Sequence, residues 1–77
     1  MAGKLTLRYD KIGDILYVDK CMPYKEQESE ELADEIAVRL NPKTGEIETV
    51  EIMFFSKRLQ DNEKLELPID ANLRLAV

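Results

Sequence analysis

The chain has 77 residues, and its 16 acidic and 11 basic side chains give it a net charge of −5. Its single cysteine, Cys21, excludes an internal disulfide, and one thiol without any histidine cannot form the usual zinc site. A chain this short buries only about 60% of the surface that its unfolded form exposes. We therefore expect one domain over residues 1–77 that completes its core by oligomerisation.

The first predicted unit is a hairpin. Every second residue from Leu5 to Tyr9 is apolar, which is the two-residue period of a strand with one buried face. Residues 10–14 follow as a turn, in which Gly13 is expected to supply a positive φ. The contiguous apolar run over 15–18 predicts a second strand, covered on both faces. The loop of this hairpin would have four or five residues.

The acidic segment over 22–35 interrupts the strand pattern. It is expected to form a loop, with a helical turn over 29–33 that Ser29 would cap. Alternation then predicts a third strand over 36–40 and a fourth over about 46–54.

A turn over 41–45 joins the third and fourth predicted strands, and Gly45 would supply its left-handed residue. Ile47 is out of phase with Val50 in the apolar alternation of the fourth strand. This phase shift predicts a β-bulge near Glu48–Thr49.

The last third of the chain predicts one short helix over 56–61, with Ser56 as its cap. Alternation over 65–69 predicts a strand at a sheet edge, because Pro68 cannot donate a ladder hydrogen bond. A final apolar strand over 73–77 would pair with another protomer or fold back onto the core. The predicted fold class is α+β: a small antiparallel sheet of four to five strands, in a hairpin and meander arrangement, packed on one short helix.

Two stretches resemble a family of small bacterial, including cyanobacterial, proteins known only as a domain of unknown function. Tyr9-Asp10-Lys11 with Asp14-Ile15-Leu16-Tyr17-Val18 is similar to the opening signature of the family, and 45–52 with 55–59 is similar to its Ile-Glu-Ile strand and Ser-containing helix. The resemblance implies an antiparallel sheet with a helix and brings no catalytic residue with it. Some members are encoded beside small toxin-like ribonucleases, which implies an antitoxin-like role for part of the family.

The chain departs from the family pattern at two positions. The family usually has glycine before the third strand and inside the fourth, where this chain has Glu35 and Thr49. The resemblance therefore gives no support for a close backbone approach at these two points.

Two features predict a surface for a partner. The acidic run would attract and steer a basic partner, although charge runs are more commonly solvated, mobile loops that keep a protein soluble. The apolar alternation at the end of the chain would bind a partner directly. The predicted partner surface consists of Glu26, Glu28, Glu30, Glu31, Asp34, Leu73, Leu75 and Val77.

Catalysis is not expected, because the chain has no histidine, no phosphate-binding glycine loop and no nucleophile paired with a base. Asp10 and Asp14 could bind a divalent cation, but hydrogen bonds within the turn explain them better. Cys21 could be a reactive thiol if nearby lysines lowered its pKa, but a buried and inert cysteine is expected.

We therefore predict a non-enzymatic protein-interaction module without a metal or cofactor, which forms a homodimer or binds a small protein partner. One alternative is an antitoxin-like inhibitor of a small basic ribonuclease, and another is a small-ligand or metal-binding enzyme. The negative charge disfavours nucleic acid, and the longest apolar run, Ile52–Phe55, is far too short to cross a membrane. The unpaired cysteine and the absence of a signal sequence predict a soluble, cytoplasmic protein.

Overall fold

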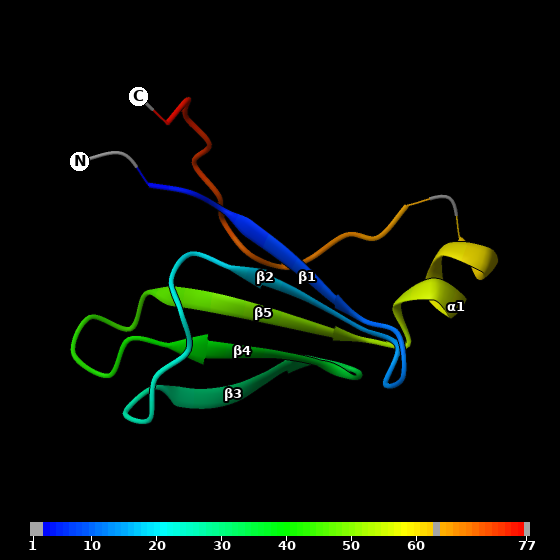
Figure 1. Cartoon of the computed structure of the whole chain (residues 1–77), viewed down its shortest axis with the longest axis horizontal. Coiled ribbons are helices and arrows are strands. Elements are labelled where there is room, and N and C mark those ends of the chain that lie inside the picture. The colour runs from blue at the N-terminus through cyan, green and yellow to red at the C-terminus, as the bar shows by residue number, and fades with distance from the viewer. Residues whose placement is uncertain (1–2, 63, 77) are drawn as a thin grey trace.

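A computed structural model describes residues 3–62 and 64–76. It contains one five-stranded antiparallel sheet in the order β1-β2-β5-β4-β3, followed in the chain by a single helix (Figure 1). The elements are β1 (Thr6–Asp10), β2 (Ile15–Asp19), β3 (Glu28–Ala33), β4 (Ile36–Leu40), β5 (Ile47–Met53) and α1 (Phe55–Asp61). This arrangement confirms the predicted α+β class.

One face of the sheet carries the core. The cross-strand registers place Val18, Val50 and Val38 in one row and Leu16, Ile52 and Ile36 in the next. Of these six side chains, the four on β4 and β5 are buried. The side chains that pack against this core include Phe55 at the start of α1 and Leu65, Leu67 and Ile69 of the segment that follows the helix.

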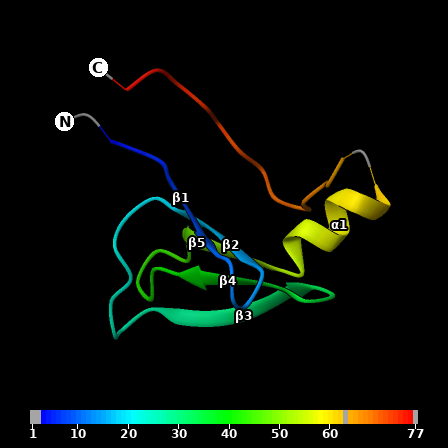
Figure 2. The same ribbon diagram turned by 45° about the vertical axis from the view of Figure 1, so that its right-hand side comes forward.

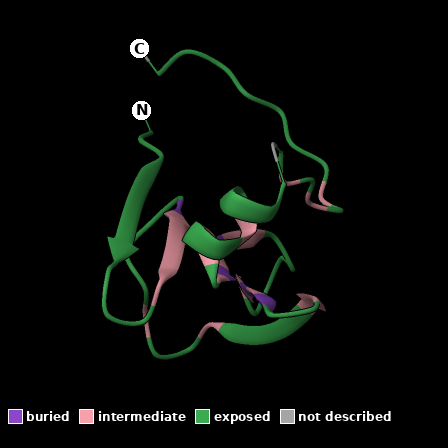
Figure 3. Ribbon diagram, turned by 90° about the vertical axis from the view of Figure 1, so that its right-hand side faces the viewer, coloured by how far each residue is buried: buried purple, intermediate pink, exposed green. Residues whose placement is uncertain are grey.

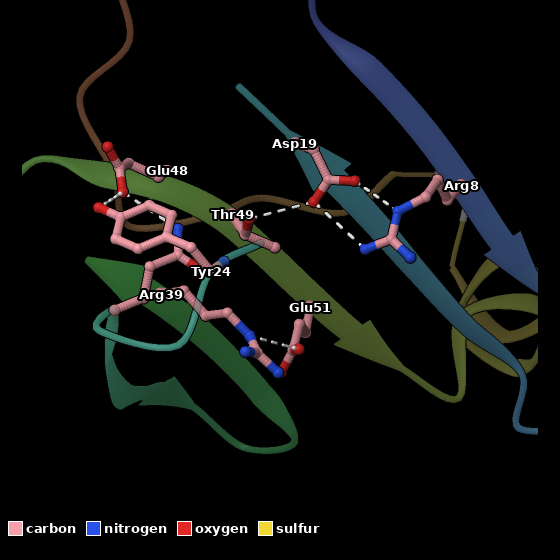
Figure 4. Close-up of polar contacts among 8 residues, drawn as sticks. Arg8, Asp19, Tyr24, Arg39, Glu48, Thr49 and Glu51 are labelled. Carbon is pink, nitrogen blue, oxygen red and sulfur yellow. Dashed lines mark hydrogen bonds and ion pairs between the residues drawn. The ribbon is translucent and has the colours of Figure 1, made fainter. Parts of the chain in front are cut away.

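The opposite face is held by polar contacts. Arg8 donates to the buried Asp19 carboxylate at 2.5 Å, and the Thr49 hydroxyl donates to the same carboxylate at 3.0 Å (Figure 4). The hydrogen bond from Arg8 lowers the pKa of Asp19 most, burial opposes that shift, and Thr49 adds to it. The Arg8 guanidinium also lies 4.4 Å from the centre of the Tyr17 ring. This network fixes Thr49 inside the sheet at the second position where the family usually has glycine.

The turn between β4 and β5 and its bulge follow the predictions. Gly45 has a φ of 75°, so it supplies the expected left-handed residue. Arg39 pairs with Thr49 while Leu40 pairs with Ile47, which leaves Glu48 as the extra residue of a bulge.

The bulge directs the Glu48 carboxylate at the connection between β2 and β3. Tyr24 donates to its Oε1 atom at 2.6 Å (Figure 4), Gln27 donates to the same oxygen at 3.0 Å, and Asn41 donates to Oε2 at 3.3 Å. These donors, Tyr24 first and Gln27 next, lower the pKa of Glu48. The carboxylate in turn raises the pKa of Tyr24 to about 12, so the phenol stays protonated as a donor at neutral pH.

The prediction of a loop with a helical turn over 29–33 is wrong, because Glu28–Ala33 is strand β3. Helix-favouring glutamates are overridden here by antiparallel pairing with β4, which is interrupted by one register shift between Glu31 and Ala33. The two-residue connection, Asp34–Glu35, is closed by Glu35 at a φ of 59°. Arg58 of α1 donates to the Asp34 carbonyl at 2.6 Å and holds this turn in place.

The prediction of an edge strand over 65–69 is also wrong. The chain bends at Pro68, where the Ile69 amide donates to the Leu67 carbonyl at 2.8 Å, and Leu65, Leu67 and Ile69 pack onto the core. Apolar residues alternate with polar ones both in a strand at a sheet edge and in a segment that covers a sheet face. The pattern alone therefore could not distinguish these two structures. Residues 73–76 form no strand within the chain, so their pairing with another protomer stays a prediction, and Val77 lies outside the described residues.

Two local predictions at turns need correction. Gly13 does not supply the positive φ of the first turn; Asp14 does, at 55°. Ser56 does not cap α1, whose N-cap is Phe54 with a φ of 54° and no side-chain hydrogen bond. Ser56 instead donates to Asp14.

Replacing Glu35 with glycine should stabilise the protein. A residue with a Cβ in the left-handed conformation destabilises the folded state by about 1–2 kcal/mol, and glycine removes this cost. Glycine also raises the conformational entropy of the unfolded chain, which opposes part of the effect, so we expect the free energy of unfolding to rise by about 0.5–1 kcal/mol. The measurement is the free energy of unfolding in urea. Glu35→Ala is the matched control, because it removes the same carboxylate but keeps the Cβ; equal stabilisation of both variants would contradict the backbone explanation.

Candidate interaction surface

The sheet ends in two outer strands, β1 and β3, and these differ in chemistry. Every residue of β1 is exposed, whereas β3 has four exposed residues followed by half-buried Leu32 and Ala33. An outer strand presents unpaired backbone N–H and C=O groups to its surroundings and can pair with another chain. The side chains along each edge therefore decide what can bind there.

An apolar strip follows the β1 edge on the core side of the sheet. Leu7 is paired with Val18 and Tyr9 with Leu16, so both point to the same face as the core. Leu5, Leu7 and Tyr9 are nevertheless 54%, 62% and 45% exposed. Figure 3 shows why, since buried segments lie in the middle of the sheet and the N-terminal strand is exposed along its length. We call these three residues the β1 strip.

The acidic residues of the predicted partner surface gather at the other edge. Glu28, Glu30 and Glu31 lie on β3 and are exposed, and Asp34 lies in the turn that follows. Glu26 lies two residues before β3 and is exposed too. The structure therefore places this run along a paired strand rather than in an open loop.

The apolar part of the predicted surface lies elsewhere. Leu73 and Leu75 are 82% and 91% exposed in the extended C-terminal segment. That segment runs on the β1 side of the sheet, away from β3, in both Figure 1 and Figure 2. The two halves of the predicted surface are thus separate, and sequence reasoning did not include the β1 strip in either of them.

The most connected side chain beside the β1 strip is Asp14. Its carboxylate accepts from the Tyr9 hydroxyl at 2.5 Å, the Ser56 amide at 3.0 Å and the Ser56 hydroxyl at 2.8 Å, and its carbonyl accepts from the Phe55 amide at 3.0 Å. The Tyr9 and Phe55 rings meet edge to face, with their centroids 6.1 Å apart. We call this cluster of Tyr9, Asp14, Phe55 and Ser56 the Asp14 latch.

The hydrogen bonds of the Asp14 latch stabilise the structure. The hydrogen bond from Tyr9 and then that from the Ser56 amide lower the pKa of Asp14. A carboxylate with a lowered pKa is a weaker base, so it is poorly suited to activate the Ser56 hydroxyl. Tyr9, Asp14 and Ser56 all belong to the stretches that resemble the family signature, which is the one sequence signal that pointed to this contact.

The other turn carboxylate, Asp10, behaves as the simpler interpretation predicts. It accepts from the backbone amides of Ile12 and Gly13 at 3.0 and 3.2 Å, as turn aspartates commonly do. Within residues 3–62 and 64–76, no group of three or more Cys, Asp and Glu side chains is placed to hold a metal ion.

Cys21 is exposed, so the prediction of a buried cysteine is wrong. The pKa of its thiol is nonetheless raised, by partial desolvation first and then by the charges of Glu48 and Asp19. A raised pKa leaves less thiolate at neutral pH and makes the sulfur less reactive. A hollow beside the start of β1 includes Cys21, but Arg8 and Lys20 on its wall are held in ion pairs with Asp19 and Glu46.

Acid should weaken the Asp14 latch. The folded pKa of Asp14 lies below its ordinary value of 3.8, so its contribution to stability is complete above that value and is lost as the pH falls through the folded pKa. Asp14→Asn keeps the left-handed turn but accepts at one oxygen only, so it should lower the urea midpoint near neutral pH. The deficit should shrink as the pH falls below 3.8 and through the folded pKa.

The matched control for this measurement is Asp70→Asn, the same change at an exposed residue of the C-terminal segment. It should leave the urea midpoint unchanged near neutral pH. A deficit of Asp14→Asn that stayed constant down to low pH would contradict a role for the ionised carboxylate.

Comparison with known proteins gives one match. The family model of DUF2283, described as a protein of unknown function, matches residues 6–56. Neither the curated proteins nor the solved structures include one that matches this chain. With seven residues, α1 is the only helix of residues 3–62 and 64–76, and it is too short and too polar to cross a membrane. Because the match runs from the first residue of β1 to the serine of the Asp14 latch, the chain belongs to the DUF2283 family of proteins of unknown function.

Proposed function

We propose that this chain is a non-enzymatic interaction module that associates with a second copy of itself. The observation that carries the proposal is the β1 strip, in which Leu7 and Tyr9 of an outer strand, and Leu5 directly before it, are exposed beside a free backbone edge. An outer strand of this kind invites pairing unless charge or proline protects it. Exposed, unpaired Cys21 fits a reducing compartment such as the cytoplasm.

The small size of the core supports association. The apolar side chains buried within the described residues are Ile36, Val38, Val50 and Ile52. A domain of this size gains stability when it buries further apolar surface against a partner. The β1 strip continues the core face outward, so covering it would extend the same apolar layer.

The test is the mass of the protein in solution, by size-exclusion chromatography with light scattering. We expect a mass near twice the 8.9 kDa of one chain at micromolar concentration. Leu7→Lys should give a monomer, because it puts a charge in the middle of the β1 strip. Ile12→Lys, at the fully exposed tip of the β1–β2 turn, is the matched control and should keep the dimer mass. A monomeric wild-type protein would overturn the proposal.

A second candidate function rests on the acidic β3 edge. Exposed Glu28, Glu30 and Glu31 along one outer strand favour a basic partner, as an antitoxin-like inhibitor of a small basic ribonuclease would need. Binding of that kind weakens steeply as salt is added. The lack of a basic protein encoded beside this chain, or binding to it that ignores salt, would remove this candidate.

A further inference from the structure

We infer that two copies of this chain join by antiparallel pairing of β1 with β1, about a two-fold axis at Leu7, to form one continuous ten-stranded sheet. The inference rests on the proposed function and adds the edge, the direction and the register of the contact. Three observations carry it: the direction of the backbone groups of β1, the charges along the strand, and the chemistry of the other edge.

The free backbone groups of β1 belong to its apolar residues. In an antiparallel sheet, the N–H and C=O of one residue point to the same neighbour, and the direction alternates along the strand. The amide of Lys20, directly after β2, donates to the Glu48 carbonyl at 2.8 Å, so the backbone of Tyr17 points the other way, to β1. Tyr17 pairs with Arg8, whose backbone therefore points inward. The groups that face outward are those of Leu7 and Tyr9, and the same alternation, continued one residue before β1, adds Leu5.

The outward groups restrict the register. Two β1 strands can exchange hydrogen bonds when an outward residue of one lies opposite an outward residue of the other. With the axis at Leu7, Leu7 of one copy lies opposite Leu7 of the other, and Leu5 lies opposite Tyr9 of the second copy. All three outward residues of each chain then have a partner.

Charge selects this register over its neighbours. With the axis at Leu7, Lys4 lies opposite Asp10 of the second copy, and Arg8 lies opposite uncharged Thr6. Moving the axis to Arg8 puts two guanidinium groups opposite each other, and moving it to Thr6 puts Lys4 opposite Arg8. Like charges directly opposite each other destabilise a sheet, whereas opposite charges stabilise it.

The apolar strips merge in the same arrangement. A two-fold axis perpendicular to the sheet keeps the core faces of both copies on one side. The Leu5 and Tyr9 side chains then pair across the axis, and the two Leu7 side chains meet at it. Aromatic and aliphatic cross-strand pairs of this kind are the units that stabilise a sheet.

The β3 edge does not offer an equivalent contact. Two β3 strands paired about a similar axis would bring the exposed carboxylates of Glu28, Glu30 and Glu31 together. Joining β3 to β1 would match charges, but these strands run in the same direction at opposite edges of the sheet. If β3 of one copy paired with β1 of the next and all copies had the same orientation, the two strands would be parallel. Such pairing would repeat from copy to copy and build an open chain of molecules instead of a closed dimer.

Disulfide trapping tests the register. In a Cys21→Ser background, Leu7→Cys should link to itself in oxidised glutathione, because directly opposite residues have Cα atoms about 4.5–5.5 Å apart, within disulfide range. Thr6→Cys and Arg8→Cys are the matched controls, one residue to either side. Their copies would lie about 7–8 Å apart on the diagonal, beyond that range, so we expect linking at least about tenfold slower.

The outcomes separate this inference from the proposed function. Preferential linking through Leu7→Cys supports the register. Faster linking through Thr6→Cys or Arg8→Cys would overturn it, as would a dimeric wild-type protein in which none of the three variants links. A wild-type protein that is monomeric by light scattering would instead overturn the proposed function itself. Masses that grow beyond the dimer would show the β3-to-β1 arrangement and also overturn the two-fold contact.

If Leu7→Cys fails to fold, a charge variant gives a second measurement. Lys4→Glu should weaken the dimer at least about tenfold, because it places two carboxylates opposite each other at both ends of the contact. Lys43→Glu, in the exposed turn between β4 and β5, makes the same charge change away from β1 and should leave the dimer unchanged. Equal effects of the two variants would overturn the register.

Discussion

The Asp14 carboxylate joins parts of the chain that are 42 residues apart, since it accepts from Tyr9 on β1 and from Ser56 at the start of α1. Because Asp14 itself occupies a left-handed position, the turn directs its side chain and its carbonyl at the first residues of the helix. The start of α1 is therefore fixed by this residue. Phe55 and Arg58 add further contacts, because Phe55 packs onto the core and Arg58 donates to the Met53 and Asp34 carbonyls, although no residue of the helix is fully buried.

Fixing α1 in this place also decides what the second layer leaves uncovered. Phe55 of the helix and the apolar side chains of residues 65–69 pack against the buried side chains of β4 and β5, whereas the apolar side chains of the β1 strip remain exposed. The other face of the sheet carries the polar network of Arg8, Asp19 and Thr49. Glutamates protect the β3 edge from pairing with its own copy, as charges commonly do on outer strands. The β1 edge is therefore the apolar surface to which we expect a second copy to bind.

Much of the fold was predictable, because alternation and turn chemistry act locally. The strands β1, β4 and β5, the turn at Gly45 and the bulge at Glu48 all follow from apolar phase and from residues with special backbone preferences. Strand β3 was missed because its residues favour helix, and only pairing with β4 makes them a strand. That pairing depends on a tight turn closed by Glu35 in a conformation that glycine adopts more readily, so the family pattern of glycine there was a usable signal.

The interaction surface was less predictable than the fold. The β1 strip is exposed because the side chains that pack against the core do not extend to it. The apolar alternation of Leu5, Leu7 and Tyr9 is the same whether this face of the strand is covered or exposed. The acidic run was recognised, but its placement on an outer strand needed the topology. The contact between Asp14 and Ser56 likewise depends on where β5 ends beside the first turn, which no local pattern specifies.

Hydrogen exchange of individual β1 amides, followed by NMR at rising protein concentration, tests the central claim that this edge binds a second copy. The account predicts that the Leu7 amide becomes protected as concentration increases, because it is free in the monomer and bonded in the dimer. The Arg8 amide, which faces β2, should be protected at every concentration. A Leu7 amide that exchanges freely at concentrations where the protein is dimeric would contradict pairing through β1.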